Sequence, residues 1–125
     1  MTTFVVDSSI VLKWLHEEDD SERARALSRE NLLAPPLLYL EVVNVAARKW
    51  QWQEQALVEL VHQLERSGVA FDEPPPVGVA RWAARGLTAY DASYLALAEA
   101  HECRLVTADS RILERAADIA AALGT

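Results

Sequence analysis

Four acidic residues occupy positions that surface solvation alone does not explain. Asp7 and Asp109 each come at the end of a short apolar run, where a carboxylate is partly withdrawn from water. Glu41 lies near the apolar side of a predicted helix, and Asp91 lies in the first turn of another. If the fold brings these acids together, they form a site that holds a metal ion.

Each acid also has a structural explanation. Asp is common at strand ends and at helix N-caps, which fits Asp7 and Asp109. Glu41, after a Pro-Pro pair, stands where it interacts favourably with a helix dipole. Thr88 and Asp91 have the spacing of a capping box, with Asp in place of the usual Glu. For single residues, the structural and the functional explanations both stay open.

Four carboxylates in one half-buried place require a cation. A single pair about 4 Å apart repels by ~4 kcal/mol at an effective dielectric constant of about 20. Oxygen ligands with no His or Cys beside them in sequence favour Mg²⁺ or Mn²⁺ over zinc. Such an ion keeps several waters and binds phosphate oxygens, and Ser9 and Thr107 are placed to orient the acids or those waters.

The elements that must position these residues alternate along the chain. We expect strands at 3–6, 32–34, 69–71 and 104–106, and leave open an edge strand within 118–123. A first helix is expected to about Leu15 with Ser8 or Ser9 as its N-cap, and further helices at 21–30, 37–50, 53–67, 77–85, 88–101 and 112–117. This order predicts one α/β domain over 1–125: a doubly wound parallel sheet of about four or five short strands flanked by helices, with a helical hairpin. Ligands of such sheets bind beyond the carboxyl ends of the strands, where these acids are expected.

Composition limits the class of protein. The chain has 125 residues, 51% of them hydrophobic, and 12 Lys and Arg against 19 Asp and Glu give a net charge of −7. The apolar fraction excludes general disorder. The single Cys103 excludes an internal disulfide, and no apolar run is long enough for a membrane helix. A lone cysteine is typical of a reducing compartment, so we expect a cytoplasmic protein, and we also expect no secretory signal.

Other chemistries find little support. The four glycines form neither a dinucleotide-binding motif nor a P-loop. A phosphoaspartate enzyme or receiver domain needs a second Asp two residues after the first, where this chain has Ser9. The three histidines are scattered, and Cys103 is explained by packing. The acid excess also argues against passive nucleic-acid binding through Lys and Arg alone.

Several segments closely resemble the PIN-domain nucleases and, within them, the VapC toxins of bacterial toxin–antitoxin pairs. The matching segments are Asp7-Ser-Ser9, Glu41 followed by Asn44, the run from Thr88 to Ala98 around Asp91, and Leu105-Val-Thr-Ala-Asp109. The resemblance extends from Thr3 to about Leu113, and the Asp91 and Asp109 segments are its most specific parts.

The resemblance implies an endoribonuclease dependent on Mg²⁺ or Mn²⁺, with Asp7, Glu41, Asp91 and Asp109 as its acidic quartet and Ser9 and Thr107 as accessory hydroxyls. We expect Asp7 and Asp109 to be direct ligands, and Glu41 and Asp91 to serve a second metal ion or to position water. The family also implies an RNA substrate, a homodimer and an inhibiting VapB-like antitoxin. The alternatives are a PIN-like binding module without catalysis and, less favoured, a small aspartate-dependent phosphatase or receiver-like domain.

Aromatic and basic residues outside the quartet offer candidate contacts. Trp50 and Trp52, beside Arg48 and Lys49 at the tip of the predicted hairpin, either stack on nucleobases or belong to a protein interface, which we favour. Trp14 and Leu15 fit a core position. In the resembled family, however, that region helps to bind the antitoxin.

Overall fold

The centre of the molecule is a five-stranded parallel sheet in the order β3-β2-β1-β4-β5. The computed structural model describes residues 1–124, so Thr125, the last residue of the expected domain, lies outside the described residues. The strands are β1 (Thr3–Val6), β2 (Asn31–Ala34), β3 (Ala70–Phe71), β4 (Arg104–Val106) and β5 (Ala120–Ala121). Phe4 pairs with Leu32 on one side and with Arg104 on the other, so β1 is central. This confirms the expected parallel α/β sheet.

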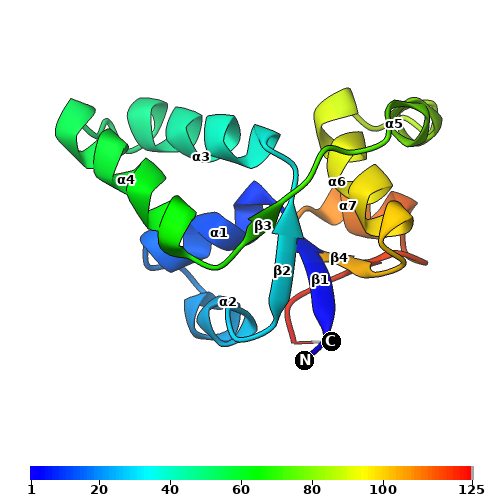
Figure 1. Cartoon of the computed structure of the whole chain (residues 1–125), viewed down its shortest axis with the longest axis horizontal. Helices are drawn as coiled ribbons and strands as arrows, with labels where there is room; N and C mark the ends of the chain where they lie inside the picture. The colour runs from blue at the N-terminus through cyan, green and yellow to red at the C-terminus, as the bar shows by residue number, and fades with distance from the viewer. Residues whose placement is uncertain (125) are drawn as a thin grey trace.

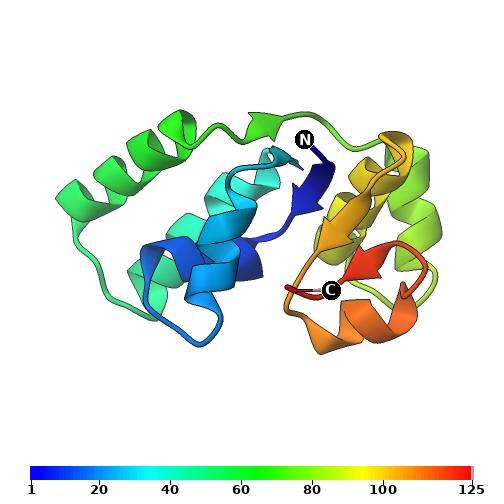
Figure 2. The ribbon, with the colours of Figure 1, turned by 90° about the horizontal axis from the view of Figure 1, so that it is seen from below.

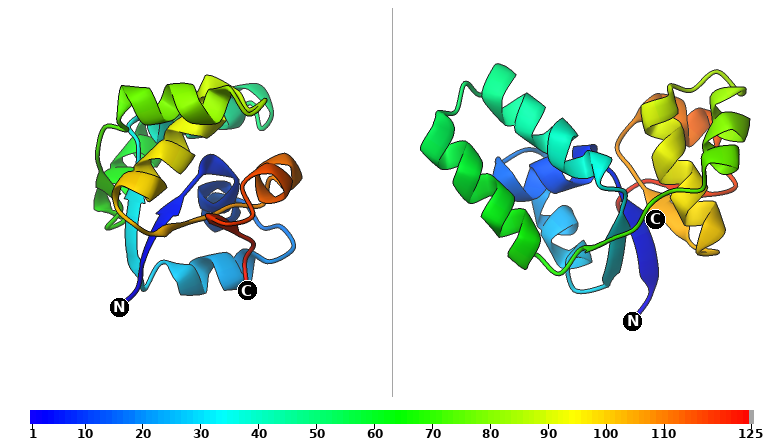
Figure 3. Two further views of the ribbon diagram at one scale, coloured as in Figure 1. Left: turned by 90° about the vertical axis from the view of Figure 1, so that its right-hand side faces the viewer. Right: turned by 45° about the horizontal axis from the view of Figure 1, so that its top comes forward.

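Seven helices cover the two faces of the sheet within residues 1–124. They are α1 (Ser8–Leu15), α2 (Ser21–Leu27), α3 (Leu37–Arg48), α4 (Glu54–Arg66), α5 (Pro76–Ala83), α6 (Ala89–Ala100) and α7 (Ser110–Arg115). Helices α1 to α4 lie on one side and α5 to α7 on the other (Figure 1 and Figure 2). The right-hand view of Figure 3 shows α3 and α4 as an antiparallel hairpin across the sheet from α5 and α6.

Helix α6 is buried because it lies between the sheet and α5. Its residues 92–98 are all buried, which explains their many alanines. Gly78 of α5 allows the close approach, since a Cβ there would stand only 3.1 Å from the Cβ of Ala96. Helix α6 is thereby held between α5 and the sheet.

Several expected boundaries need correction. The N-cap of α1 is Asp7, whose side chain accepts a hydrogen bond from the backbone N–H of Ser9, and neither Ser8 nor Ser9 takes that position. Helix α7 begins at Ser110, two residues before the expected start, because Asp109 caps it. The expected helix 21–30 ends at Leu27. The edge strand left open within 118–123 exists as β5, paired with β4.

Strands β1 and β4 are neighbours, but the chain leaves them toward opposite faces, β1 into α1 and β4 into α7. This is the topological switch point, where open α/β sheets bind ligands. Within residues 1–124, no helix has both the length and the apolar character needed to cross a membrane.

Candidate functional site

Asp7 is the most buried of the four acids, with 5% of its surface exposed. It stands at the carboxyl end of β1, in the extended conformation that a helix N-cap requires. The Ser9 hydroxyl donates a hydrogen bond to its Oδ1 at 2.5 Å, and the Thr107 hydroxyl donates one to its Oδ2. Asp7 thus joins the ends of β1 and β4.

Each of the two hydroxyl groups accepts a hydrogen bond from the backbone and donates its own proton to Asp7, whose ionised carboxylate can only accept. The N–H of Ala108 donates to Ser9 Oγ at 2.9 Å, and the N–H of Asp109 donates to Thr107 Oγ1 at 3.0 Å. Each hydroxyl proton is therefore directed at a carboxylate oxygen. These contacts hold the Asp7 carboxylate in one orientation, and the accessory role of Ser9 and Thr107 stays a prediction.

Burial governs the protonation of Asp7. The pKa of Asp7 is raised from 3.8 to about 6, chiefly by desolvation and to a smaller extent by the nearby charge of Glu41. The hydrogen bonds from Ser9 and Thr107 oppose this rise, because they stabilise the ionised form. Asp7 therefore carries its charge at neutral pH, at a cost to folding.

Asp109 follows β4 and caps α7, as its structural explanation required. Its Oδ1 accepts hydrogen bonds from the backbone N–H groups of Arg111 at 2.8 Å and Ile112 at 3.2 Å. A capping carboxylate keeps lone pairs free for other partners. The cap and a ligand role are therefore compatible in this residue.

Glu41 reaches the site from α3, half-buried. The buried Tyr94 of α6 donates a hydrogen bond from its hydroxyl to Glu41 Oε1 at 2.5 Å. Burial raises the pKa of Glu41, the charge of Asp91 adds to that, and hydrogen bonds from Tyr94 and Ser8 oppose it. The same surroundings raise the pKa of Tyr94, so its proton stays on the donor.

Asp91 lies in the first turn of α6, where the Thr88 side chain accepts a hydrogen bond from its backbone N–H at 3.1 Å. This is half of the expected capping box. Burial raises the pKa of Asp91, and the charge of Asp109 raises it further. Arg111 of α7 lies 3.7 Å from Asp91 Oδ2 and opposes the shift.

The fold therefore brings the four predicted acids to one edge of the sheet, where their charges repel one another in neighbouring pairs. The charge of Glu41 raises the pKa of Asp7, the charge of Asp91 raises that of Glu41, and the charge of Asp109 raises that of Asp91. As the side chains stand, no group of three or more His, Cys, Asp or Glu residues within 1–124 is arranged to hold a metal ion. Each carboxylate instead accepts hydrogen bonds or faces Arg111. The donor set, all oxygen and mutually repelling, fits a hard divalent cation.

Tyr94 and Ser8 are the site residues that the sequence analysis missed. The aromatic side chain of Tyr94 in an alanine-rich helix indicates only a core position. Its spacing of three from Asp91 places both on neighbouring positions of one helix face, which was the available signal. For Ser8, the sequence suggested only an N-cap, and the contact with Glu41 depends on how α1 and α3 pack.

The remaining candidates lie away from the quartet. Trp50 stacks on His16, with ring centroids 4.6 Å apart, and lies 5.2 Å from Trp52. Both tryptophans pack partly against the core, while Arg48 and Lys49 are exposed. Trp14 and Leu15 are half-buried, and the Trp14 indole N–H donates to the carbonyl of Ala24 at 2.6 Å. These contacts show that the tryptophans stabilise the fold, and their contacts with an antitoxin or RNA stay predictions.

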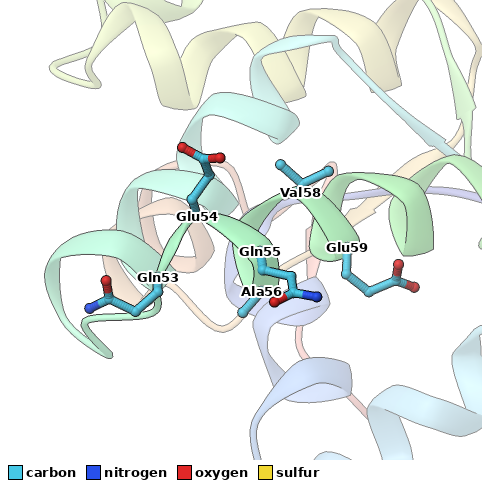
Figure 4. Close-up of a pocket in the computed structure, with 6 residues that line it drawn as sticks. All are labelled: Gln53, Glu54, Gln55, Ala56, Val58 and Glu59. Atoms are coloured by element: carbon cyan, nitrogen blue, oxygen red, sulfur yellow. The ribbon is translucent and has the colours of Figure 1, made fainter.

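Two surface hollows are candidate ligand sites, and only one of them adjoins the quartet. One, of about 430 Å³, has Glu41 in its wall and so adjoins the quartet. The larger, of about 940 Å³, is lined only by the start of α4 and contains none of the four acids (Figure 4). Its lining residues are Gln53, Glu54, Gln55, Ala56, Val58 and Glu59. Their polar side chains diverge in Figure 4, so we assign it no site.

Known proteins resemble this chain both in sequence and in structure. The family model of the PIN domain matches residues 4–119. VapC ribonuclease Mb0985 of Mycobacterium bovis is 36% identical over 112 residues, covering 86% of this chain and 87% of the relative. VapBC-1 from nontypeable Haemophilus influenzae has a similar structure, with a TM-score of 0.71, 16% identity, and coverage of 99% of this chain and 100% of that one. Mycobacterium tuberculosis VapC20, a sarcin–ricin loop cleaving toxin, gives a TM-score of 0.70 at 13% identity, covering 92% of this chain and 94% of that one.

Proposed function

This chain belongs to the PIN domain family, and from that premise we propose that it is a metal-dependent endoribonuclease, the toxin of a VapBC-like toxin–antitoxin pair. One observation carries the proposal: Asp7, Glu41, Asp91 and Asp109, from four separate segments, lie within electrostatic reach of one another at the switch point. The ribonuclease relative at 36% identity supports the reaction class.

We assign Asp7 and Asp109 as direct ligands of Mg²⁺ or Mn²⁺, and Glu41 and Asp91 as ligands of a second ion or as groups that position water. When bound, such an ion lowers the pKa of a coordinated water and stabilises charge on the phosphate undergoing hydrolysis. The chain itself supplies orientation: Ser9 and Thr107 hold Asp7, and Tyr94 holds Glu41. Arg111, beside Asp91, is placed to bind a phosphate oxygen.

The proposal includes three partners. RNA is the substrate, and a VapB-like antitoxin is the inhibitor, which the VapBC-1 relative supports. The homodimer rests on the family resemblance alone. We retain Trp14, Leu15, Arg48, Lys49, Trp50 and Trp52 as predicted contacts with antitoxin or RNA, and the cytoplasm as the predicted compartment.

The decisive test is Asp7→Asn. Asn keeps an oxygen that can cap α1 but loses the charge of a direct ligand. The protein should therefore fold but cleave RNA more than about a hundredfold more slowly, since loss of a group that only orients a metal ligand already costs about 10- to 100-fold. Cleavage of total RNA with Mn²⁺, with and without EDTA, measures this, and circular dichroism checks folding.

The matched control is Asp118→Asn, an exposed acid outside the quartet that should cleave like the parent protein. If Asp7→Asn cleaves as fast as the parent, the nuclease site is wrongly assigned. If the parent protein binds RNA but never cleaves it, the chain is a PIN-like binding module.

A further inference from the structure

The hollow beside Glu41 exposes two large apolar side chains next to a charged site. Its walls are Leu37, Leu40, Glu41, Asn44 and Tyr90. Leu40 is 70% exposed and Tyr90 is 63% exposed, and both are among the few large hydrophobic residues that the described chain leaves in water. Exposed apolar side chains gathered around one hollow mark a binding surface.

The backbone of Tyr90 is held in place. It lies in the first turn of α6 between Thr88, which caps the helix, and Asp91. Its carbonyl accepts a hydrogen bond from the Ser93 hydroxyl at 2.6 Å. The Tyr90 side chain is therefore attached to a well-ordered backbone position next to Asp91. Leu40, which also lines the hollow, precedes Glu41 on α3.

We propose that this hollow binds a nucleobase of the RNA, next to the phosphate that is cleaved, with Tyr90 and Leu40 as its stacking surface. The inference rests on the proposed function and adds to it a subsite for the base. The lining of the hollow contains one carboxylate, Glu41, and no cationic side chain that would bind a phosphate, so attraction here comes from the uncharged part of a nucleotide. A flat aromatic base fits a tyrosine ring and a leucine side chain, because every base has a π face that stacks without regard to sequence.

Asn44 supplies the polar part of the subsite. It follows Glu41 by three residues on α3, lies on the same helix face, and is exposed. Its amide both donates and accepts hydrogen bonds, which suits the edge of a base. The subsite therefore stacks through Tyr90 and Leu40 and selects among bases through Asn44.

The test measures binding without cleavage. In the Asp7→Asn background, fluorescence anisotropy reports binding of a labelled single-stranded RNA of about 12 nucleotides, within the usual range for single-strand sites. The same measurement uses a chain of equal length that keeps the sugars and phosphates but lacks the bases. Tyr90→Ala should bind the RNA roughly 5- to 140-fold more weakly, as loss of a stacked base predicts, and should bind the baseless chain as tightly as the protein with Tyr90 does.

Two variants complete the design. Tyr90→Phe should bind like the parent, because it keeps the ring, and Val58→Ala, an exposed apolar residue on α4, serves as the matched control. Equal RNA binding by Tyr90→Ala and the parent overturns the subsite, as does a defect only in binding the antitoxin. Because the assay needs no cleavage, these results are distinct from failure of the parent protein to cleave RNA, which would overturn the nuclease itself.

Discussion

Tyr94 contributes to the site through one atom, its hydroxyl oxygen. Its ring is 1% exposed and packs as a core residue of α6, while its hydroxyl holds the Glu41 carboxylate. A hydrogen bond from a neutral donor to a carboxylate favours the ionised form and fixes its orientation. The hydroxyl therefore positions Glu41, and the ring stabilises the fold.

Tyr94→Phe separates these two functions. It keeps the ring and removes the hydroxyl, so RNA cleavage should fall by about tenfold, as loss of a hydrogen bond to a charged group predicts. The pKa of Glu41 should rise further, which moves the acid limb of the pH–rate profile to higher pH. Tyr39→Phe, on the stacked pair with Phe71, is the control and should change neither. An unchanged pH profile in Tyr94→Phe would show that the hydroxyl has no positioning function.

At the scale of elements, Asp7, Asp91 and Asp109 lie at helix beginnings, whereas Glu41 lies in the second turn of α3. Asp7 caps α1, Asp109 caps α7, and Thr88 caps α6 just before Asp91. Capping requires an oxygen at the N-terminus of a helix, and the sheet places these helix starts at its carboxyl edge. For these three acids, the same geometry is therefore compatible with a structural role and with the proposed role in the site.

Thr88→Ala tests this dependence of the site on a cap. Loss of the side-chain oxygen should destabilise the protein by about 1 kcal/mol, because the N–H of Asp91 loses its partner. The first turn of α6 should also fray, which lowers the cleavage rate through Asp91. Urea denaturation and a cleavage assay measure the two effects. Thr88→Ser restores the oxygen and should recover both, and a stable but inactive Thr88→Ser would contradict the capping explanation.

At the scale of the whole molecule, the quartet accounts for part of the acid excess. The net charge is −7, and without the four site acids the remaining 15 acids nearly balance the 12 basic residues. The quartet therefore concentrates the excess charge at one edge, where it weakens the fold and attracts cations.

The stability of the metal-free protein should therefore depend on pH through Asp7. Its pKa is 3.8 when unfolded and about 6 when folded, so the folded state holds the proton more tightly. Stability is greatest below pH 3.8 for this group and falls as pH rises toward 6, by about 3 kcal/mol in all, at 1.36 kcal/mol per pKa unit.

Urea denaturation in EDTA, across this pH range, measures that loss. Asp7→Asn should lack the component, and Mg²⁺ should reduce it in the parent protein, since an ion bound only to the folded state stabilises it. A parent and variant with the same pH dependence would contradict the buried charge at Asp7.

The sequence by itself determined the fold class, most of the strands and helices, and the position of Asp7 and Asp109 after two parallel strands. Alternating strands and helices allow few topologies, and parallel strands put their carboxyl ends together, so Asp7 and Asp109 had to meet. Apolar periodicity and capping residues are local properties, which is why they can be read directly from the chain.

Only the tertiary structure determined what each acid contacts. Tyr94 and Glu41 are 53 residues apart, and their hydrogen bond depends on how α3 and α6 face each other across the site. The directions of the Ser9 and Thr107 hydroxyls, and the exposed ring of Tyr90 beside Asp91, likewise follow from packing between distant segments. Side-chain orientation is set by neighbours that the sequence does not place, so the chemistry of the site became specific only in the folded chain.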